Sequence, residues 1–235
     1  MRKKTAGKLN APPAQQEFNL IRLTSLCRKV GGVFYRLHST DPGTGKPWPP
    51  LHFSRRGNSR FDSRGGVGTL CIASTLPGAL MELFDDHWGP VGSLGRSVTE
   101  LTLAETWVSL VSLPRVTLLD ATGANLSKLG TDAQLLTGNY STTRKWAARL
   151  MRHPDQIEGI LYRSRHDPDR LNVALFERDI LLPVACDPGF TPEMIGSWRR
   201  KAAYGSGLIY GPAMTLRDHP KLNQSLVELQ VARLP

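Results

Sequence analysis

The pattern of apolar and polar residues along the chain predicts a protein built mainly from short β-strands. Runs rich in β-branched and aromatic residues, bounded by turn-forming residues, are typical of strands. Such runs occur at 33–37, 69–73, 98–103, 116–119, 157–162 and 171–176. The predicted core is therefore a sheet.

Apolar residues spaced by three or four predict a few helices between these strands. Thr75 is expected to cap a helix over 76–88. Ser141 or Thr142 is expected to cap a second helix, in which Trp146 and Leu150, and Ala147 and Met151, recur at a spacing of four. A third helix is expected over 126–136. Because these helices do not alternate regularly with the strands, the predicted fold class is α+β, with a mixed or antiparallel β core and flanking helices.

The composition is that of an ordinary globular protein with a basic charge. The chain has 235 residues, 40% of them hydrophobic, and a formal net charge of +10 at pH 7. It contains no run of about 18 apolar residues, the length of a membrane span. Its N-terminal segment lacks the apolar stretch of a secretory signal. We therefore expect a cytoplasmic protein with no membrane association.

Cysteine and histidine are spaced too widely to predict a disulfide or a metal site. Cys27, Cys71 and Cys186 form no close pair, and the six histidines show neither HxH nor HExxH spacing. No metal and no bound cofactor are expected.

The excess of positive charge is concentrated near the N-terminus. Residues 1–36 hold eight basic residues and one acidic residue, a net charge of +7, which leaves +3 for the rest of the chain. A cationic segment attracts nucleic acid or acidic proteins through its field. A solvated terminus explains the same charge. A basic nucleic-acid-binding protein without catalysis is therefore one candidate function.

Several common catalytic motifs are missing from the sequence. It has no GxSxG nucleophile elbow, no GxxxxGK[ST] phosphate loop and no GxGxxG opening a helix after a strand. Gly65, Gly66 and Gly68 precede a predicted strand, which is the wrong position for a dinucleotide fingerprint. These absences argue against a serine hydrolase, a P-loop NTPase and a Rossmann dehydrogenase.

Four polar residues at strand ends, in a loop and on one helix are candidates for a site. Arg36 ends an apolar strand, and Arg60 lies in the Gly- and Ser-rich loop 54–68, where a guanidinium can bind phosphate through two hydrogen bonds. Glu82 lies among apolar residues of a predicted helix, and an ionised carboxylate there needs a partner. Ser164 directly follows a predicted strand and is flanked by Arg163 and Arg165. Taken singly, each also fits an ordinary surface or turn position.

Together these residues occur in an order that resembles the RES family, named for arginine, glutamate and serine. FYRLH at 34–38 is similar to the family's opening strand with its arginine, Arg36. GNSRFDSRGGVGTLCIASTLPGALMELF at 57–84 is similar to a Gly- and Arg-containing loop, a strand and the helix that bears the glutamate. EGILYRSRHDPDRLNVALFERD at 158–179 is similar to the segment with the serine and the strand after it. The resemblance covers about 33 to 178.

The resemblance carries the family's loop arginine, its aromatic neighbour, the glutamate and the serine onto Arg60, Phe61, Glu82 and Ser164. Three positions, in two places, depart from the family pattern. Asp62-Ser63 stands where the family has Asn-Pro, and Cys71 stands where it has a tyrosine near the ligand.

The resemblance implies an ADP-ribosyltransferase-like fold and an enzyme that degrades NAD+ by hydrolysis or phosphorolysis of the nicotinamide–ribose bond. NAD+ would then be a substrate, with inorganic phosphate as a candidate co-substrate. The resemblance predicts a catalytic domain over 33–186. Residues 1–32 and 187–235 have no counterpart in the family pattern. The charge of the first segment predicts a basic N-terminal extension, and the weak periodicity and Gly and Pro breaks of the second predict a C-terminal region packed on the same core.

The candidate residues suit this chemistry. Nicotinamide leaves from a cationic ring as a neutral molecule, so the barrier is the formation of a ribosyl oxocarbenium ion. A fixed carboxylate stabilises such a charge. By resemblance, the catalytic residues are Glu82, Arg36 and Ser164. The pyrophosphate would be bound by Arg36 and Arg60, a ribose hydroxyl or the nicotinamide would be oriented by Ser164, and a stacking face would come from Phe61 or Tyr35.

The family also implies a partner, because its members are bacterial toxins of toxin–antitoxin systems. A cognate antitoxin of the helix-turn-helix type is expected, and nucleic acid would be contacted only through it. The acceptor of the ADP-ribose stays open between water, inorganic phosphate and a macromolecule, the last being the reaction of an ADP-ribosyltransferase. Arg165 is a candidate site for a phosphate acceptor, although a solvated arginine explains it equally well.

Overall fold

The computed structural model describes residues 10–64, 66–84, 96–165, 167–181, 184–188 and 207–235. The strands are β1 Cys27–Ser39, β2 Thr69–Ala73, β3 Arg96–Thr99, β4 Thr106–Ala121, β5 Gly159–Arg163, β6 Leu171–Phe176, β7 Val184–Cys186, β8 Leu208–Tyr210, β9 Met214–Thr215 and β10 Val231–Leu234. The helices are α1 Gln15–Phe18, η1 Leu23–Leu26, α2 Leu76–Phe84, α3 Glu100–Glu105, α4 Asn125–Lys128, α5 Gln134–Thr137, α6 Tyr140–Met151, η2 Asp179–Leu181, η4 Leu216–Asp218 and α8 Leu222–Glu228.

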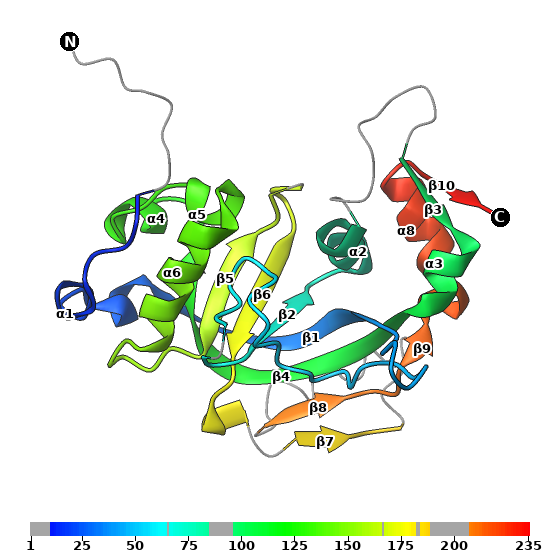
Figure 1. Cartoon of the computed structure of the whole chain (residues 1–235), viewed down its shortest axis with the longest axis horizontal. Helices are drawn as coiled ribbons and strands as arrows, with labels where there is room; N and C mark the ends of the chain where they lie inside the picture. Colours follow the sequence, from blue (N-terminus) through cyan, green and yellow to red (C-terminus); the bar gives the residue numbers. More distant parts are fainter. Residues whose placement is uncertain (1–9, 65, 85–95, 166, 182–183, 189–206) are drawn as a thin grey trace, which may run out of the picture.

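A mixed sheet forms the centre of the described structure. Eight of the described strands lie in it, in the order β1-β2-β6-β5-β4-β8-β7 with β9 on β4, and β1 also pairs with β4. Most neighbours are antiparallel, while β4–β5 and β7–β8 are parallel. α2 lies between two groups of helices, α4–α6 at one end of the molecule and α3 with α8 at the other (Figure 1). The predicted α+β class with a mixed sheet is confirmed.

β1 and β4 extend well beyond the predicted strands at 33–37 and 116–119. A proline inside a run argues against a continuous central strand, and Pro114 interrupts the pattern of β4. The register of the β1–β4 pair shifts at Gly31, which accommodates the proline as a bulge. A Cβ at Gly31 would lie 3.2 Å from the Pro114 carbonyl oxygen, so glycine gives the two backbones room.

Residues 98–103, predicted as one strand, are the end of β3 followed by α3. Thr99 ends the strand, and its side chain accepts a hydrogen bond from the Thr102 N–H at 3.2 Å. The prediction was wrong because Thr99 is both β-branched and a good helix cap.

The predicted helix behind Thr75 is confirmed over 76–84, and its residues 85–88 lie outside the described part of the chain. The Thr75 hydroxyl accepts a hydrogen bond from the Gly78 N–H at 3.1 Å, which is the expected cap. Apolar residues on one face of α2 pack on the sheet, and this packing fixes the direction of the opposite face.

The other two helix predictions need correction at their ends. α6 is capped by Asn139, whose side chain accepts from the Ser141 N–H at 2.7 Å, so neither Ser141 nor Thr142 is the cap. The helix predicted over 126–136 is split into α4 and α5. Gly130, with φ at 81°, takes a left-handed conformation that ends the first of them.

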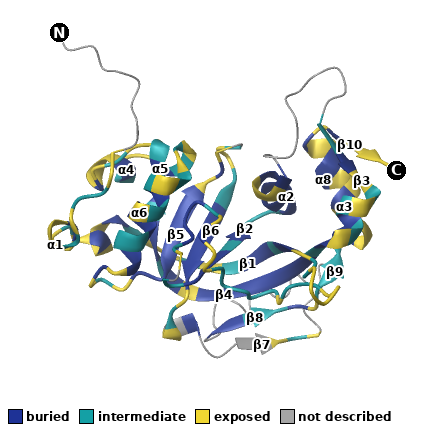
Figure 2. Cartoon of the chain, viewed as in Figure 1, coloured by how far each residue is buried: buried dark blue, intermediate teal, exposed yellow. Residues whose placement is uncertain are grey.

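The central strands are largely buried (Figure 2), and alternating residues of these strands pack in different apolar clusters. Phe34 packs among the strands of the sheet, while its neighbour Tyr35 packs with α2 and α8. A further cluster joins α6, β5 and the N-terminal residues around Phe18 and Trp146. The sheet is therefore buried on both faces.

Described residues before β1 pack on α6. The Trp146 Nε1–H donates to the Asn10 carbonyl at 2.9 Å, the Arg149 Nε–H donates to the Pro13 carbonyl at 3.1 Å, and Phe18 lies edge-on to Trp146. Of the segment predicted as an extension over 1–32, residues 10–26 thus contact the domain, 27–32 belong to β1, and 1–9 lie outside the described residues.

Residues 207–235 pack against the side of α2 that faces away from α6. Leu222 and Leu226 of α8 share a cluster with Leu80 of α2. Arg170 connects the two helices, because its guanidinium donates to the Thr75 hydroxyl at 3.0 Å and forms an ion pair with Glu228 of α8. Residues 189–206 lie outside the described structure.

The buried His38 leads to a prediction about stability and pH. Burial, followed by the nearby charge of Arg36, lowers its pKa from 6.5 to about 4. Its Nε2 lies 3.1 Å from the Ser109 hydroxyl. As the pH falls below 6.5, the unfolded chain binds a proton that the folded protein excludes, so stability falls towards pH 4.

We expect wild-type protein to lose about 2 kcal/mol more stability than His38→Gln between about pH 7 and about pH 5. Urea unfolding of both proteins at the two pH values measures this difference. Equal losses in the two proteins would show that His38 is not excluded from protonation.

Candidate active site

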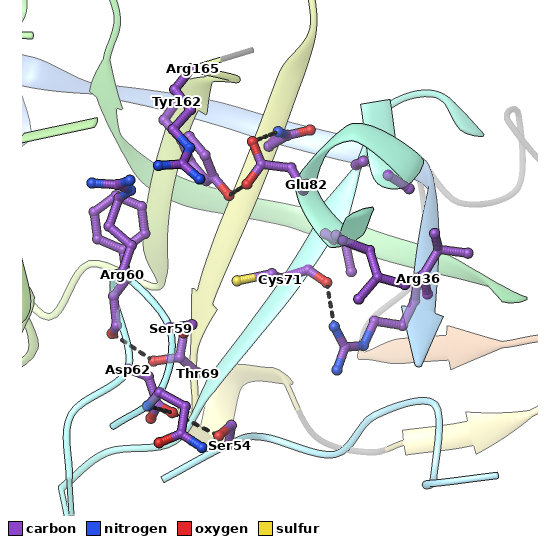
Figure 3. Close-up of a pocket in the computed structure, with 18 of the residues that line it drawn as sticks. Arg36, Ser54, Ser59, Arg60, Asp62, Thr69, Cys71, Glu82, Tyr162 and Arg165 are labelled. Carbon is purple, nitrogen blue, oxygen red and sulfur yellow. Dashed lines mark hydrogen bonds between the residues drawn. The ribbon is translucent and has the colours of Figure 1, made fainter. Parts of the chain in front are cut away.

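A cavity of about 530 Å³ lies between α2, the strands β1, β2 and β6, and the loop 54–62 (Figure 3). This volume is in the range of small-molecule sites. Three of the predicted site residues that line it carry a charge, namely Arg36, Arg60 and Glu82. Arg36 and Glu82, which are 46 residues apart in the sequence, are brought to one cavity by the β1–β2 pairing and by the helix that follows β2.

Glu82 reaches the cavity from the face of α2 that points away from the core. Glu82 and Leu83 are exposed and line the cavity together with the buried Ala79, while Leu80 and Phe84 are buried in the apolar cluster under the helix. Spacings of three and four residues share a helix face, which explains this division. The partly apolar surroundings noted in the sequence therefore belong to the other face of α2.

Two side chains of the sheet hold the Glu82 carboxylate. The Asn172 Nδ2–H donates to Oε1 at 2.9 Å, and the Tyr162 hydroxyl donates to Oε2 at 3.4 Å. Burial, followed by the negative charge of Glu82, raises the pKa of Tyr162 well above its usual value, so the phenol keeps the proton that it donates. Both carboxylate oxygens thus have a defined orientation.

Arg36 extends from β1 into the cavity wall. Its Nη1–H donates to the Cys71 carbonyl at 3.1 Å, while its Nε–H has no hydrogen-bond partner among the described residues. Burial lowers the pKa of Arg36, but guanidinium groups keep their charge in proteins. A buried cation with an unused donor is costly without an anion.

Arg60 lies on the side of the cavity opposite to Arg36 in the view of Figure 3. Its Nη1–H donates to the Gly138 carbonyl at 2.8 Å, and its guanidinium lies over the Tyr140 ring at 4.7 Å. Nη2 has no hydrogen-bond partner within the described ranges. Arg36 and Arg60 therefore each have one buried N–H-bearing nitrogen without a hydrogen-bond partner among the described residues.

The loop that carries Arg60 is fixed by Asp62, which is fully buried. Its Oδ2 accepts hydrogen bonds from the Ser54 hydroxyl at 2.7 Å and from the N–H groups of Gly57 at 2.9 Å and Asn58 at 3.3 Å. Asp62, at the position where the family pattern has asparagine, thus shapes the loop through acceptor contacts that need a carboxylate or carbonyl oxygen. The sequence analysis missed this role.

The structure brings Tyr35 and Phe61 to the cavity but leaves Ser164 outside its lining as far as the chain is described. Tyr35 packs edge-on against His219, and Phe61, only 1% exposed, packs edge-on against Tyr162. Ser164 is buried one residue beyond β5, and its N–H donates to the Arg170 carbonyl at 3.0 Å. Its exposed neighbour, Arg165, does line the cavity.

Cys71 occupies the middle of the cavity wall. Burial raises the pKa of its thiol to about 11. The thiolate is the reactive form of cysteine, so a thiol that stays protonated at neutral pH is a poor nucleophile. Cys71 contributes shape and a backbone acceptor for Arg36.

The described residues hold no group of three side chains able to bind a metal ion. None of the helices in the described ranges has both the length and the apolar character of a membrane span.

The fold and the site define an α+β protein with a small-molecule cavity whose lining combines the hydrogen-bonded Glu82 carboxylate with the guanidinium groups of Arg36, Arg60 and Arg165. The sequence matches the RES domain over residues 33–191, so the chain belongs to the RES domain family and the resemblance seen in the sequence is confirmed. No curated protein matches the chain.

Among solved structures, the chain is similar to a chain of the crystal structure of the M. tuberculosis MbcT–MbcA toxin–antitoxin complex. The TM-score is 0.57 at 12% sequence identity, over 90% of this chain and 100% of that chain. At this identity the likeness concerns the fold.

Proposed function

We propose that this protein is the toxin of a toxin–antitoxin system and that it cleaves the nicotinamide–ribose bond of NAD+, with water or inorganic phosphate as acceptor. One observation carries the proposal: the Glu82 carboxylate, held by hydrogen bonds from Asn172 and Tyr162, lines a cavity that also contains two arginines with unused N–H groups. Membership in the RES domain family supports it.

The proposed chemistry uses the negative charge of Glu82. As the bond to nicotinamide breaks, the sugar carbon gains positive charge, and a carboxylate fixed in advance stabilises that charge without reorganising. The leaving group becomes neutral as it departs, so no acid is needed to protonate it. Water or phosphate then adds to the carbon and loses a proton to solvent.

The proposed anion sites are Arg36 and Arg60. NAD+ carries a pyrophosphate, and a guanidinium binds such oxygens through charge-assisted hydrogen bonds. The free N–H groups of both side chains provide donors for it. For Ser164, the hydrogen bond to the Arg170 carbonyl supports a role in shaping the turn before β6.

The proposed partner is an antitoxin protein of the helix-turn-helix type. The support is family membership and the fold shared with a chain from a toxin–antitoxin complex. Arg60 and Arg165 in the cavity lining suit an acidic segment of such a partner. A nucleic-acid-binding protein without catalysis is less well supported, because the RES domain match covers residues 33–191, which include the cavity residues Arg36, Arg60 and Glu82.

Product analysis tests the proposed reaction. Purified protein is incubated with NAD+, with and without inorganic phosphate and with and without a protein extract. We expect free nicotinamide together with ADP-ribose, or with its 1-phosphate when phosphate is the acceptor. A labelled macromolecule would instead identify an ADP-ribosyltransferase, and unchanged NAD+ would contradict the proposal.

A further inference from the structure

Asn172 is a buried polar residue in an apolar strand, and the sequence analysis gave it no role. It is the second residue of β6, in the run LNVALF, and is only 1% exposed. The register pairs it with Tyr162 on β5 and with Ala73 on β2, and all three line the cavity. An amide at this position requires hydrogen-bond partners, since burying it without them is costly.

The nitrogen of the Asn172 amide has a hydrogen-bond partner, but its oxygen has none among the described residues. Nδ2 donates to the Glu82 Oε1 at 2.9 Å, which fixes the orientation of the amide, because the opposite orientation would place two acceptors against each other. Oδ1 has no hydrogen-bond partner in the described residues. A buried, unused acceptor next to a catalytic carboxylate calls for a donor from a ligand.

The groups next to the Asn172 oxygen indicate which kind of donor a ligand must bring to it. The Tyr162 hydroxyl already donates to the Glu82 Oε2. An ionised carboxylate offers only acceptors. The Glu82 carboxylate and the Asn172 carbonyl oxygen therefore form two adjacent acceptors, which match two neighbouring hydroxyl groups of one sugar.

We propose that Asn172 is a positioning residue that orients Glu82 through Nδ2 and binds one hydroxyl of the ribose cis-diol through Oδ1. This inference rests on the proposed cleavage of NAD+ and specifies which part of the substrate the site recognises. The Glu82 carboxylate accepts a hydrogen bond from the other hydroxyl of the diol. The pair of acceptors thereby selects a ribose that carries both hydroxyls of the cis-diol.

The test compares NAD+ with two analogues in which the nicotinamide ribose lacks either the 2′- or the 3′-hydroxyl. For wild-type protein, removal of the hydroxyl that Asn172 binds is expected to lower kcat/KM by about 10- to 100-fold. Asn172→Ala is expected to lower kcat/KM for NAD+ by a similar factor and to treat NAD+ and that analogue alike. A purely structural asparagine would lose activity on all three substrates by the same factor, and that result would overturn the inference.

Two further variants separate the two roles of the amide. Tyr162→Phe removes the other hydrogen bond to Glu82 but keeps the Asn172 carbonyl, so it is expected to discriminate between the substrates as the wild type does. Asn172→Asp has nearly the same volume and keeps an acceptor, but it places a second carboxyl group against Glu82, so the two groups share a proton and Glu82 loses part of its negative charge. It is expected to lower kcat while discrimination persists, and an unchanged kcat would contradict the positioning role. Thermal unfolding checks that each variant is folded.

Equilibrium binding separates this inference from the proposed function. Calorimetric titration of Glu82→Gln, with and without Asn172→Ala, with NAD+ and both analogues measures hydroxyl recognition while bond cleavage is slow. If Glu82→Gln binds NAD+ and discriminates between hydroxyls but the wild type cleaves nothing, only the proposed reaction is wrong. If the wild type cleaves NAD+ and the double variant discriminates as Glu82→Gln does, only the role of Asn172 is wrong. If Glu82→Gln binds none of the three and the wild type cleaves nothing, both are wrong.

Discussion

Replacing Glu82 with glutamine is expected to slow NAD+ cleavage by about 1,000-fold while the protein stays folded. Glutamine has nearly the shape of glutamate. Its carbonyl oxygen can accept the Asn172 Nδ2–H, and its amide can donate to the Tyr162 hydroxyl oxygen, so both observed contacts have a replacement. What disappears is the negative charge opposite the developing oxocarbenium ion. Release of nicotinamide under single-turnover conditions measures the loss.

Glu105→Gln is the matched control for this substitution. Glu105 is an exposed residue at the end of α3 and does not line the cavity. Its replacement removes the same charge from the protein and is expected to leave cleavage at the wild-type rate. If Glu82→Gln releases nicotinamide as fast as Glu105→Gln, the carboxylate has no part in the reaction.

Replacing Arg36 with methionine is expected to raise the KM for NAD+ by about 10- to 100-fold, because a buried charge-assisted hydrogen bond to the substrate is lost. Methionine keeps most of the unbranched stem of arginine. Arg36→Lys restores the charge without the planar fork and is expected to recover only part of the affinity. Initial rates at varied NAD+ concentration give KM for each variant.

Arg56→Met provides the control for the arginine substitutions. Arg56 is exposed, stacks on Trp48 at 5.0 Å and does not line the cavity. A KM that changes equally in Arg36→Met and Arg56→Met would reflect the general positive charge of the protein. An unchanged KM in Arg36→Met would remove that residue from the binding site.

The parts of the fold that the sequence predicted are those with local signals. β6 has its predicted bounds, as does β2, because both are short, rich in β-forming residues and closed by turn residues. β4 was largely missed, since its continuity depends on pairing with β1 and on the bulge that accommodates Pro114. Pairing of this kind joins residues far apart in the chain and leaves no local pattern.

The candidate site divides in the same way. Arg36, Arg60 and Glu82 were found from their local contexts and from the resemblance to the family, and all three line one cavity. Tyr162 and Asn172 were missed because each reads as an ordinary strand residue. They reach Glu82 from 80 and 90 residues away, through the register of β5 and β6 beneath α2.

The contact between α2 and α8 has a consequence for how the protein is made. The helix that bears Glu82 shares its apolar cluster with residues from Leu216 to Val231, far later in the chain. During translation these residues leave the ribosome last among the described segments, so until then the Glu82 helix lacks partners for one of its sides. The wall of the cavity that bears Glu82 can therefore pack fully only after residues 216–231 have been synthesised.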